Sequence, residues 1–457
     1  MSQLFTYLHD ARARHLEDLL AFLRIPSISA QEAHRPDIER AADFLCDELR
    51  GLGLAVEKIT GEGNPLVYAQ TDLDPARPTI LIYGHYDVQP VDPEHLWHSP
   101  PFEPLVKEGV IYARGASDDK GQLYAHLKAV EAFVRTGVPL PVNVKFLIEG
   151  EEEKGGHSVY EFTEKNPEKL ACDAVLVSDT SLYDEDTPAI TFSLRGMCYT
   201  EILVDGPAQD LHSGSFGGTV RNPGNAIARI VASLHDERGR VTVPGFYDDV
   251  VVLDEAGRAD LNRLPYGEAE LVRDTGAPAS FGEEGHSILE RMWVRPTCDV
   301  NGLWSGYTGE GGKTIIPAKA GAKVSMRLVP NQDPEKIAKA FTDYVTANAP
   351  SGVKVEVRVL HNANPVLVPR DSAMMQAGLR ALETGFGKKA TFVGEGGSIP
   401  ITGTFQSCLK VPVVMLGYGL PNDNIHSPNE KFHLANYYNG IRSTVAFFEE
   451  AAKLARK

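Results

Sequence analysis

Apolar residues recur along this chain with two periods, one typical of helices and the other of strands. Leu16, Leu19, Leu20 and Leu23 recur at helical spacing before Pro26, and a second apolar helical face follows it. Short runs rich in β-branched and aromatic residues come next, and each is typical of a strand. These runs cover residues 54–59, 65–70, 79–84, 141–149 and 173–179. Their alternation with helical segments and short connections predicts an α/β sheet.

The run PVNVKFLIEGEEEKGG joins one of these predicted strands to a crowd of acids. Apolar residues alternate along the strand, and Glu149, Glu151, Glu152 and Glu153 follow it. Four carboxylates at the end of a buried strand repel one another unless they splay into water or a cation neutralises them. A solvated acidic turn and a divalent metal site at the carboxyl end of a strand are both consistent with this run.

Further acids and a histidine stand at the ends of other predicted elements. His85 and Asp87 end an apolar strand and, being two residues apart, point to one side of it, where the carboxylate can orient the imidazole. Asp118 and Asp119 precede a predicted helix, and capping accounts for only one of them. Asp179 ends the last strand of the series. Since parallel strands end at one edge of a sheet, we expect that edge to collect His85, Asp118, Glu152, Glu153 and Asp179.

The pattern changes from about Ser193, where strands of mixed polarity and two helices surround a long insert. Residues 245–290 of this insert are charged and irregular, and we expect them to be surface elaboration. The chain returns to the first pattern near Ala381 and ends in an amphipathic helix. We therefore predict an α/β domain of residues 1–192 and 381–457, interrupted by a smaller α+β domain of residues 193–380.

Composition narrows the class of protein. The apolar fraction of 42% and the charged fraction of 23% are those of a soluble globular protein. The net charge of −17 argues against nucleic acid or an anionic membrane as a partner. The five cysteines form no CxxC pair, and the first residues lack the apolar core of a signal peptide. We therefore expect a cytoplasmic protein.

The motifs of several enzyme classes are absent. The chain has no GxSxG elbow, no HExxH and no P-loop, and a glycosidase would not need the histidines. Imidazole and carboxylate groups together suit Zn²⁺, with Mn²⁺ or Co²⁺ as replacements. Five candidate ligands exceed the three that one catalytic zinc takes, so a carboxylate shared between two ions is expected.

The order of the motifs in this chain resembles that of a known family. The motifs GHYDV, RGASDDKG, EGEEEKGG, VSD, DLHSG, SMRLVPN, GEGGSIP and IHSPNEK occur in this order. Together they are similar to those of the zinc-dependent family of aminoacylase, succinyl-diaminopimelate desuccinylase and the carboxypeptidases G, above all to its carnosinase-like dipeptidase branch. In that family a zinc-binding α/β domain is interrupted by an α+β lid domain that also dimerises.

The resemblance implies roles for individual residues. It implies two divalent ions, one bound by His85 and Asp179 and the other by Glu153 and His426, with Asp118 bridging them. Asp87 would orient His85, and the Asp118–Asp119 peptide bond would be cis. Glu152 would be the general base, although Glu151, one residue earlier, is the alternative. The resemblance further implies that His212 stabilises the oxyanion in the partner subunit and that the substrate meets Arg327, Thr314, His361, Gly397 and Ser398.

These implications predict a homodimeric dizinc exopeptidase that hydrolyses dipeptides or short peptides with a free C-terminal carboxylate. A water molecule between the ions would be the nucleophile, and Arg327 would bind the carboxylate through its planar fork. An N-acyl-amino-acid deacylase or carbamoylase of the same family has the same motifs. A non-catalytic scaffold that kept the fold is the alternative from another class.

Overall fold

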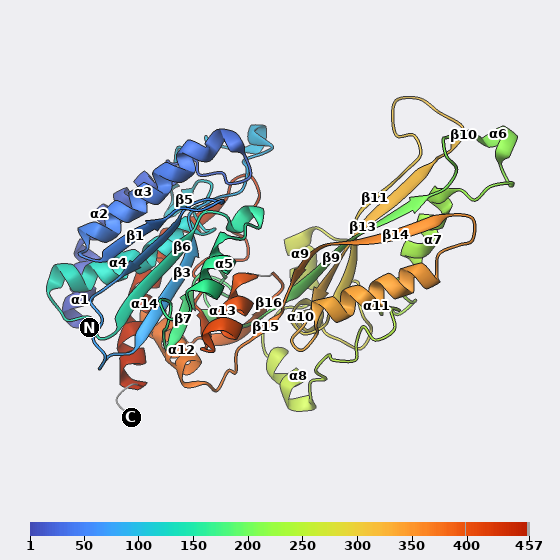
Figure 1. The fold of residues 1–457 in the computed structure, drawn as a ribbon. Coiled ribbons are helices and arrows are strands. Elements are labelled where there is room, and N and C mark those ends of the chain that lie inside the picture. Colours follow the sequence, from blue (N-terminus) through green and yellow to red (C-terminus); the bar gives the residue numbers. More distant parts are fainter. Residues whose placement is uncertain (398, 455–457) are drawn as a thin grey trace. The chain divides into compact units, whose positions relative to one another are not determined.

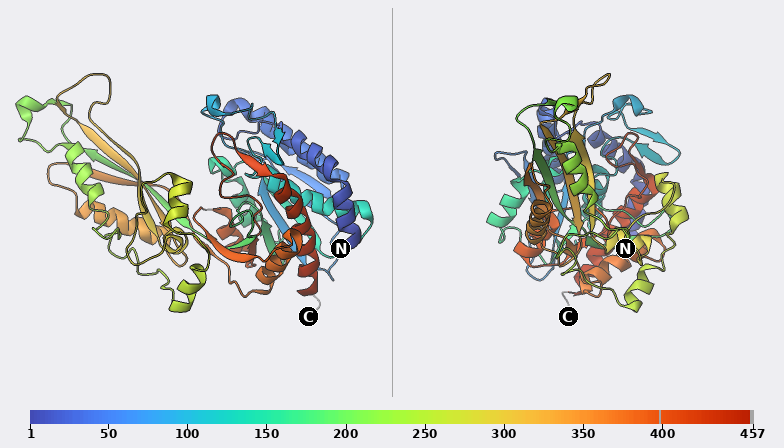
Figure 2. Two further views of the ribbon diagram at one scale, coloured as in Figure 1. Left: turned by 180° about the vertical axis from the view of Figure 1, so that it is seen from behind. Right: turned by 90° about the vertical axis from the view of Figure 1, so that its right-hand side faces the viewer.

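The computed structural model describes residues 1–397 and 399–454, and these form two compact units. The first unit contains Met1–Phe192, Val368–Val393 and the chain from Thr404 onward. The second contains Ser193–Leu367 and Gly394–Gly403. Figures 1 and 2 show the elements of each unit from three sides.

The chain re-enters the first unit at Val368, whereas the sequence pattern places the return near Ala381. The difference arises because helix α12 (Ala373–Phe386) packs on the C-terminal helix α14 (Leu434–Leu454). Met375 and Leu382 of α12 are buried, so this helix belongs to the core of the first unit along its whole length.

The first unit is built on a sheet with the strand order β1-β2-β6-β3-β7-β17-β8. Its strands are β1 (Ala55–Ile59), β2 (Leu66–Gln70), β3 (Thr79–His85), β6 (Asn143–Glu149), β7 (Ala174–Val177), β8 (Ala189–Leu194) and β17 (Val413–Met415), and the short strands β15 (Val366–Leu367) and β16 (Thr391–Glu395) pair with β8. The central strand β3 runs parallel to both of its neighbours, β6 and β7. These three strands therefore end at the same edge of the sheet, with His85 opposite Glu149.

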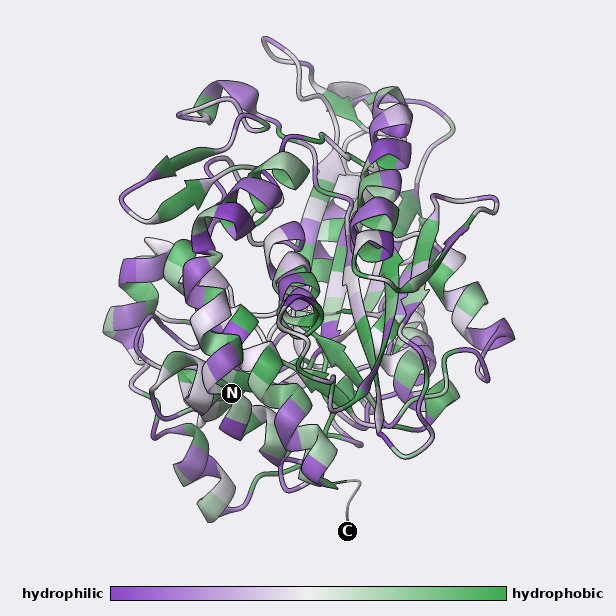
Figure 3. Ribbon diagram, turned by 90° about the vertical axis from the view of Figure 1, so that its left-hand side faces the viewer, coloured by the Kyte–Doolittle hydropathy of each residue, from purple (hydrophilic) through white to green (hydrophobic). Residues whose placement is uncertain are grey.

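Helices cover both faces of this sheet (Figure 1). One face carries α3 (Arg35–Gly51) against β1 and β2, and α4 (Lys120–Thr136) against β3. Helices α1 (Ser2–Asp10), α2 (Arg12–Leu23) and α14 pack in turn on α4. The opposite face carries α13 (Ile401–Leu409), whose Phe405 ring meets Tyr83 of β3, and α5 (Ser158–Lys165) lies on the same side (Figure 1). Apolar strands lie at the centre of the unit and mixed helical surfaces outside (Figure 3), as the sequence pattern predicts.

The second unit is an antiparallel sheet in the order β11-β13-β9-β14, with helices on one face (Figure 2). Its elements are β9 (Gly196–Asp205), β11 (Thr297–Ser305), β13 (Lys319–Leu328), β14 (Lys354–Ala363), α7 (Pro223–Ala232) and α11 (Pro334–Ala347). Alternate residues of β9 and β13, among them Ile202 and Met326, pack with Ile230 of α7 and Phe341 of α11 into a separate core. The unit is thus an α+β fold.

The segment 245–290 is more regular than the sequence pattern suggests, and the expectation of irregular structure is wrong there. It contains α8 (Glu255–Leu261), α9 (Glu268–Thr275) and the start of α10 (Ile288–Trp293). Local side chains start these helices: Asp254 caps α8, and Ser287 with Glu290 forms a capping box on α10. Charged residues in short capped helices lack the long apolar period by which helices are recognised.

Smaller elements complete both units. In the first unit β4 (Leu105–Lys107), β5 (Val110–Tyr112) and β18 (Lys431–His433) form a small sheet, and short 3₁₀ helices span Glu32–His34, Glu94–Leu96 and Glu152–Lys154. In the second unit β10 (Leu211–His212) pairs with β12 (Ile315–Ile316), next to α6 (Ser213–Phe216). Within the described residues, none of the helices is both long and apolar enough to span a bilayer.

Candidate metal centre and active site

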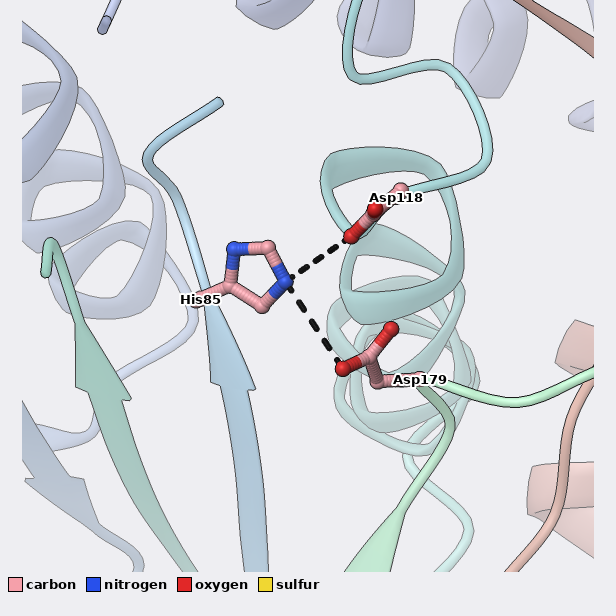
Figure 4. A group of neighbouring side chains, drawn as sticks. All are labelled: His85, Asp118 and Asp179. Carbon is pink, nitrogen blue, oxygen red and sulfur yellow. Dashed lines mark ion pairs between the residues drawn. The ribbon is translucent and has the colours of Figure 1, made fainter. Parts of the chain in front are cut away.

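Two groups of acid and imidazole side chains meet at the carboxyl edge of the parallel strands. His85, Asp118 and Asp179 form one group, and Asp118, Glu153 and His426 form the other. Within each group, the potential ligand atoms all lie within 4.8 Å of one another. Figure 4 shows the imidazole of His85 facing the carboxylates of Asp118 and Asp179. Asp118 belongs to both groups, so one carboxylate joins them.

Each member reaches the edge from a different element. His85 ends β3, Asp179 follows β7 by two residues, and Glu153 lies in the turn after β6. Asp118 precedes helix α4, while His426 comes from a loop near the C-terminal end of the chain. The peptide bond between Asp118 and Asp119 is cis, which confirms that implication of the family resemblance.

Short distances connect the two groups. His85 Nε2 lies 3.1 Å from Asp118 Oδ1 and 3.8 Å from Asp179 Oδ2. His426 Nε2 lies 2.9 Å from Asp118 Oδ2 and 3.2 Å from Glu153 Oε2. Although burial opposes it, the neighbouring imidazoles of His426 and His85 hold the pKa of Asp118 well below its usual range. Hydrogen bonds with the Asp118 and Glu153 carboxylates raise the pKa of His426 to about 11.

The backbone carbonyl of Asp87 determines the tautomer of His85. His85 Nδ1 lies 3.1 Å from the backbone carbonyl oxygen of Asp87 and 3.5 Å from its carboxylate Oδ1. The carbonyl can only accept, so the proton of the neutral ring sits on Nδ1. Nε2 is buried and makes no hydrogen bond, so its lone pair is available to a metal ion. This orphaned nitrogen among carboxylate oxygens fits a divalent cation.

Gly84 lets the helix start approach the end of β3. A Cβ at this position would stand 2.7 Å from Asp119 Oδ2 and 2.9 Å from a methyl carbon of Leu123. The close approach allows Asp119 Oδ2 to accept the N–H of His85 at 3.2 Å. Asp119 is thus the second acid of the pair, and it fixes the backbone of a candidate ligand rather than capping the helix through a side-chain bond.

The acids after β6 point in different directions. Glu151 turns away from the two groups, because Oε1 accepts the N–H of Asn64 at 2.7 Å and Oε2 accepts that of Ser158 at 3.3 Å. Burial and the charges of Glu153 and Asp118 raise the pKa of Glu152 to about 7, against the opposing charge of His85. The N–H of Glu153 donates to Asp87 Oδ2 at 3.1 Å.

Four of the remaining sequence-predicted residues lie in the second unit as two pairs, His212 with Thr314 and Arg327 with Gly397. His212 and Thr314 are neighbours, since the N–H of Ser213 donates to the carbonyl of Thr314 at 3.1 Å. His212 Nδ1 accepts the N–H groups of Gly214 and Ser215 at 2.9 and 3.2 Å, which leaves the proton of the neutral ring on Nε2.

Arg327 and Gly397 line a cavity of about 610 Å³ in the second unit, together with Arg195 and Asp299. Arg195 was not singled out from the sequence, yet its N–H donates to the carbonyl of Gly397 at 3.2 Å. His361 lies on β14 opposite Tyr199 of β9 and is not among the residues that line this cavity. Ser398 lies outside the described residues.

Comparison with known proteins identifies the family. Residues 81–450 match the model of peptidase family M20/M25/M40. The chain belongs to this family.

Individual M20/M25/M40 proteins align with nearly the whole chain. It is 34% identical to the Cys-Gly metallodipeptidase dug1 of Schizosaccharomyces pombe, covering 100% of this chain and 99% of that protein. It is 30% identical to the Beta-Ala-His dipeptidase of Rattus norvegicus, covering 99% and 96%. The solved structure of the family M20 metallo-carboxypeptidase Sso-CP2 from Sulfolobus solfataricus matches with a TM-score of 0.87 and 36% identity, covering 96% of this chain and 99% of that one.

Family membership and the two ligand groups together indicate that the chain binds divalent metal ions. The comparisons with relatives and solved structures also confirm two predictions. These are the α/β fold with an additional α+β unit and the likeness to the dipeptidase branch.

Proposed function

We propose that this chain is a metal-dependent exopeptidase that hydrolyses dipeptides or short peptides with a free C-terminal carboxylate. The observation that carries the proposal is the convergence of His85, Asp118, Asp179, Glu153 and His426 at one sheet edge, with Glu152 beside them. The names of the relatives support the substrate class, because they are dipeptidases of Cys-Gly and Beta-Ala-His.

The centre holds two ions in this proposal, with Asp118 as their common ligand. Zn²⁺ suits the mixture of imidazole and carboxylate donors, and Mn²⁺ or Co²⁺ can replace it. Bound ions of this kind polarise a carbonyl group and acidify water. Asp87 keeps Nε2 of His85 unprotonated by accepting from Nδ1 through its carbonyl.

Glu152 is the general base in this proposal. Its carboxylate takes a proton from the attacking water and delivers it to the leaving amine. A pKa of about 7 suits that task, because the group can both accept and release the proton near neutral pH. Glu151 is a poorer candidate, since both of its oxygens already accept backbone N–H groups.

The second unit acts on the substrate in this proposal and serves as lid and dimerisation domain, while the first unit, which includes helix α12, is the catalytic domain. Arg327 and Gly397 receive the C-terminal residue, with Thr314, His361 and Ser398 as further contacts. His212 presents Nε2–H, the donor needed by an oxyanion, to the active site of the partner subunit of a homodimer. Five free cysteines support a reducing, cytoplasmic setting.

Replacement of the base separates catalysis from ion binding. Glu152→Gln should lower kcat by at least about 10²- to 10⁴-fold, because the amide cannot accept the proton, while metal content stays unchanged. Glu153→Gln is the matched control, and it should lose metal as well as activity. Rates are measured on a panel of dipeptides, acetyl-amino acids and C-terminally amidated dipeptides, with metal content by elemental analysis. Turnover of acetyl-amino acids alone would replace the dipeptidase proposal by the deacylase one, and inactivity of the metal-loaded wild type on all amides would favour a scaffold.

Complementation tests the shared site. His212→Ala and Glu152→Gln proteins are each expected to be nearly inactive. A mixture under conditions of subunit exchange should recover up to about a quarter of the wild-type rate, because random pairing makes half of the dimers mixed and each mixed dimer has one intact site. The absence of recovery, with exchange verified by labelled subunits, would contradict a site completed by the partner.

A further inference from the structure

The carboxylate of Glu430 is enclosed by hydrogen-bond donors from the segment that leads to Asp118. Glu430 is fully buried. Its Oε1 accepts the N–H groups of Ser117 at 2.9 Å and Asp118 at 3.0 Å. Its Oε2 accepts the N–H of Gly115 at 3.0 Å and the guanidinium Nη1 of Arg114 at 2.8 Å. One carboxylate therefore binds four residues of a short loop through both of its oxygens.

These four partners require the ionised form of Glu430. None of the four partner atoms can accept a hydrogen bond, so a proton on either oxygen would face a donor. A charge-assisted set of this kind is stronger than four neutral hydrogen bonds and has little freedom to move.

Glu430 joins the two segments that meet at the candidate metal centre. It stands four residues after His426, whose Nε2 lies 2.9 Å from Asp118 Oδ2. The carbonyl of Glu430 also accepts the N–H of Ala113 at 3.1 Å, which continues the pairing of β18 with β5. The hydrogen bonds of Glu430 thus connect the loop that contains His426 to the loop that contains Asp118.

Further contacts hold two of the residues that donate to Glu430. Arg114 also donates from Nη2 to the carbonyl of Pro90 at 3.0 Å, and its guanidinium lies over the ring of Trp97. Asp423 Oδ2 accepts the hydroxyl of Ser117 at 3.0 Å and the N–H of Leu420 at 2.7 Å. Two of the four donor residues, Arg114 and Ser117, are therefore held by other contacts as well, which limits how far the loop can shift when the carboxylate is changed.

We propose that Glu430 is a positioning residue for metal binding: its buried carboxylate sets the place of Asp118, the ligand common to both groups, relative to His426. This inference rests on the proposed function, because it assumes that Asp118 and His426 bind divalent ions. Partners behind a ligand commonly change metal affinity by about 10- to 100-fold. Here a single partner acts on the ligand that both groups share, so both ions should be bound more weakly without it.

The test is the affinity of the chelator-treated protein, both units included, for Zn²⁺, measured by competition with a chromophoric chelator. Glu430→Gln keeps the size of the side chain but places an NH₂ group against donors. We expect its Zn²⁺ dissociation constants to rise about 10- to 100-fold. Glu131→Gln is the matched control, because Glu131 is also a buried acid of the first unit with a cationic partner, Lys128, at 2.8 Å, but is absent from both ligand groups. This control should lower the melting temperature of the apoprotein and leave the Zn²⁺ affinity unchanged.

A purely structural role for Glu430 predicts a different result. If Glu430→Gln lowers the melting temperature as Glu131→Gln does and binds Zn²⁺ within twofold of the wild type, the inference is overturned and the proposed function stands. If Glu430→Gln does not fold, Arg114→Lys is measured instead, because it keeps the charge but loses the fork. It should bind Zn²⁺ about tenfold more weakly, and wild-type affinity would overturn the inference. A wild-type chain that binds no Zn²⁺, Mn²⁺ or Co²⁺ would overturn the proposed function and this inference with it.

Discussion

At the scale of single residues, the candidate metal centre depends on the hydrogen bonds that orient each candidate ligand. Asp87 faces His85 with its carbonyl at 3.1 Å and its carboxylate at 3.5 Å, so the backbone rather than the side chain fixes the tautomer. The carboxylate instead accepts the N–H of Glu153. A residue expected to orient one ligand therefore contacts two.

The arginine in the second unit gives a prediction at this scale. Arg327 offers a planar fork to a carboxylate, and a lysine at this place would offer a single ammonium group. We expect Arg327→Lys to raise KM for a dipeptide about 10- to 100-fold through the loss of one charge-assisted hydrogen bond, with a smaller effect on kcat. Steady-state kinetics on the dipeptide and its C-terminal amide measure this effect. The amide should be a poor substrate for both proteins, and an equal loss on both substrates would mean that Arg327 does not bind the carboxylate.

Sequence reasoning found the candidate ligands because their residue types and spacing carry the signal. It did not find Glu430, although this residue lies in the last of the quoted motifs. A glutamate after a histidine in a polar loop looks like any solvated acid. Its role depends on burial and on N–H groups more than 300 positions away, such as that of Ser117, and neither is visible in a local pattern.

At the scale of elements, the geometry of the site follows from three parallel strands and one helix start. Because β6, β3 and β7 are parallel neighbours, the residues that follow these strands lie at the same edge of the sheet. Helix α4 packs against β3, and almost the whole length of the helix is buried. Its His126 lies between Ser178, next to Asp179 on the β7 side, and Thr444 of α14.

The burial of His126 predicts acid sensitivity of this packing. Burial lowers the pKa of His126 to about 3, and no charged neighbour opposes this effect. Below the unfolded pKa of ~6.5 the unfolded chain binds a proton that the folded chain does not, so stability is fully present above pH 6.5 and is lost as the pH falls toward 3. Between pH 6.5 and 5 the loss should be about 2 kcal/mol from this residue.

Urea unfolding of the metal-free protein measures that loss, with His126→Gln as the variant that keeps a donor and an acceptor but does not titrate. The wild type should lose about 2 kcal/mol more than the variant between pH 6.5 and pH 5. Equal losses in the two proteins would contradict a neutral His126 in the folded state. The comparison cancels the titration of His85 and His426, which is common to both proteins.

At the scale of the whole molecule, the chain consists of two units with separate cores. The second unit buries residues of β9, β13, α7 and α11 among themselves. Both ligand groups belong to the first unit, while Arg327, His212 and Thr314 belong to the second. Ion binding and contact with the substrate are thus distributed over different cores in the proposed function.

Removal of metal should therefore act on one unit. Zn²⁺ at a free concentration 100-fold above its dissociation constant should stabilise the first unit by about 2.7 kcal/mol, because it binds the folded form alone. Hydrogen exchange with and without a chelator should show reduced protection in β3, β6, β7 and α4 of the metal-free protein. Segments of β9, β13 and α11 should be unchanged, and an equal change in both units would contradict separate cores.

The sequence by itself determined the α/β pattern, the candidate ligands and the general division of the chain, because apolar period and residue type are local properties. It also indicated the family, since the motifs keep their order from GHYDV to IHSPNEK. The tertiary structure alone decided that Glu151 contacts Asn64 and Ser158, that α12 belongs to the first unit, and that Glu430 accepts the N–H of Asp118. Each of these depends on burial and on contacts between distant segments, and such contacts arise only when the strands and helices pack together.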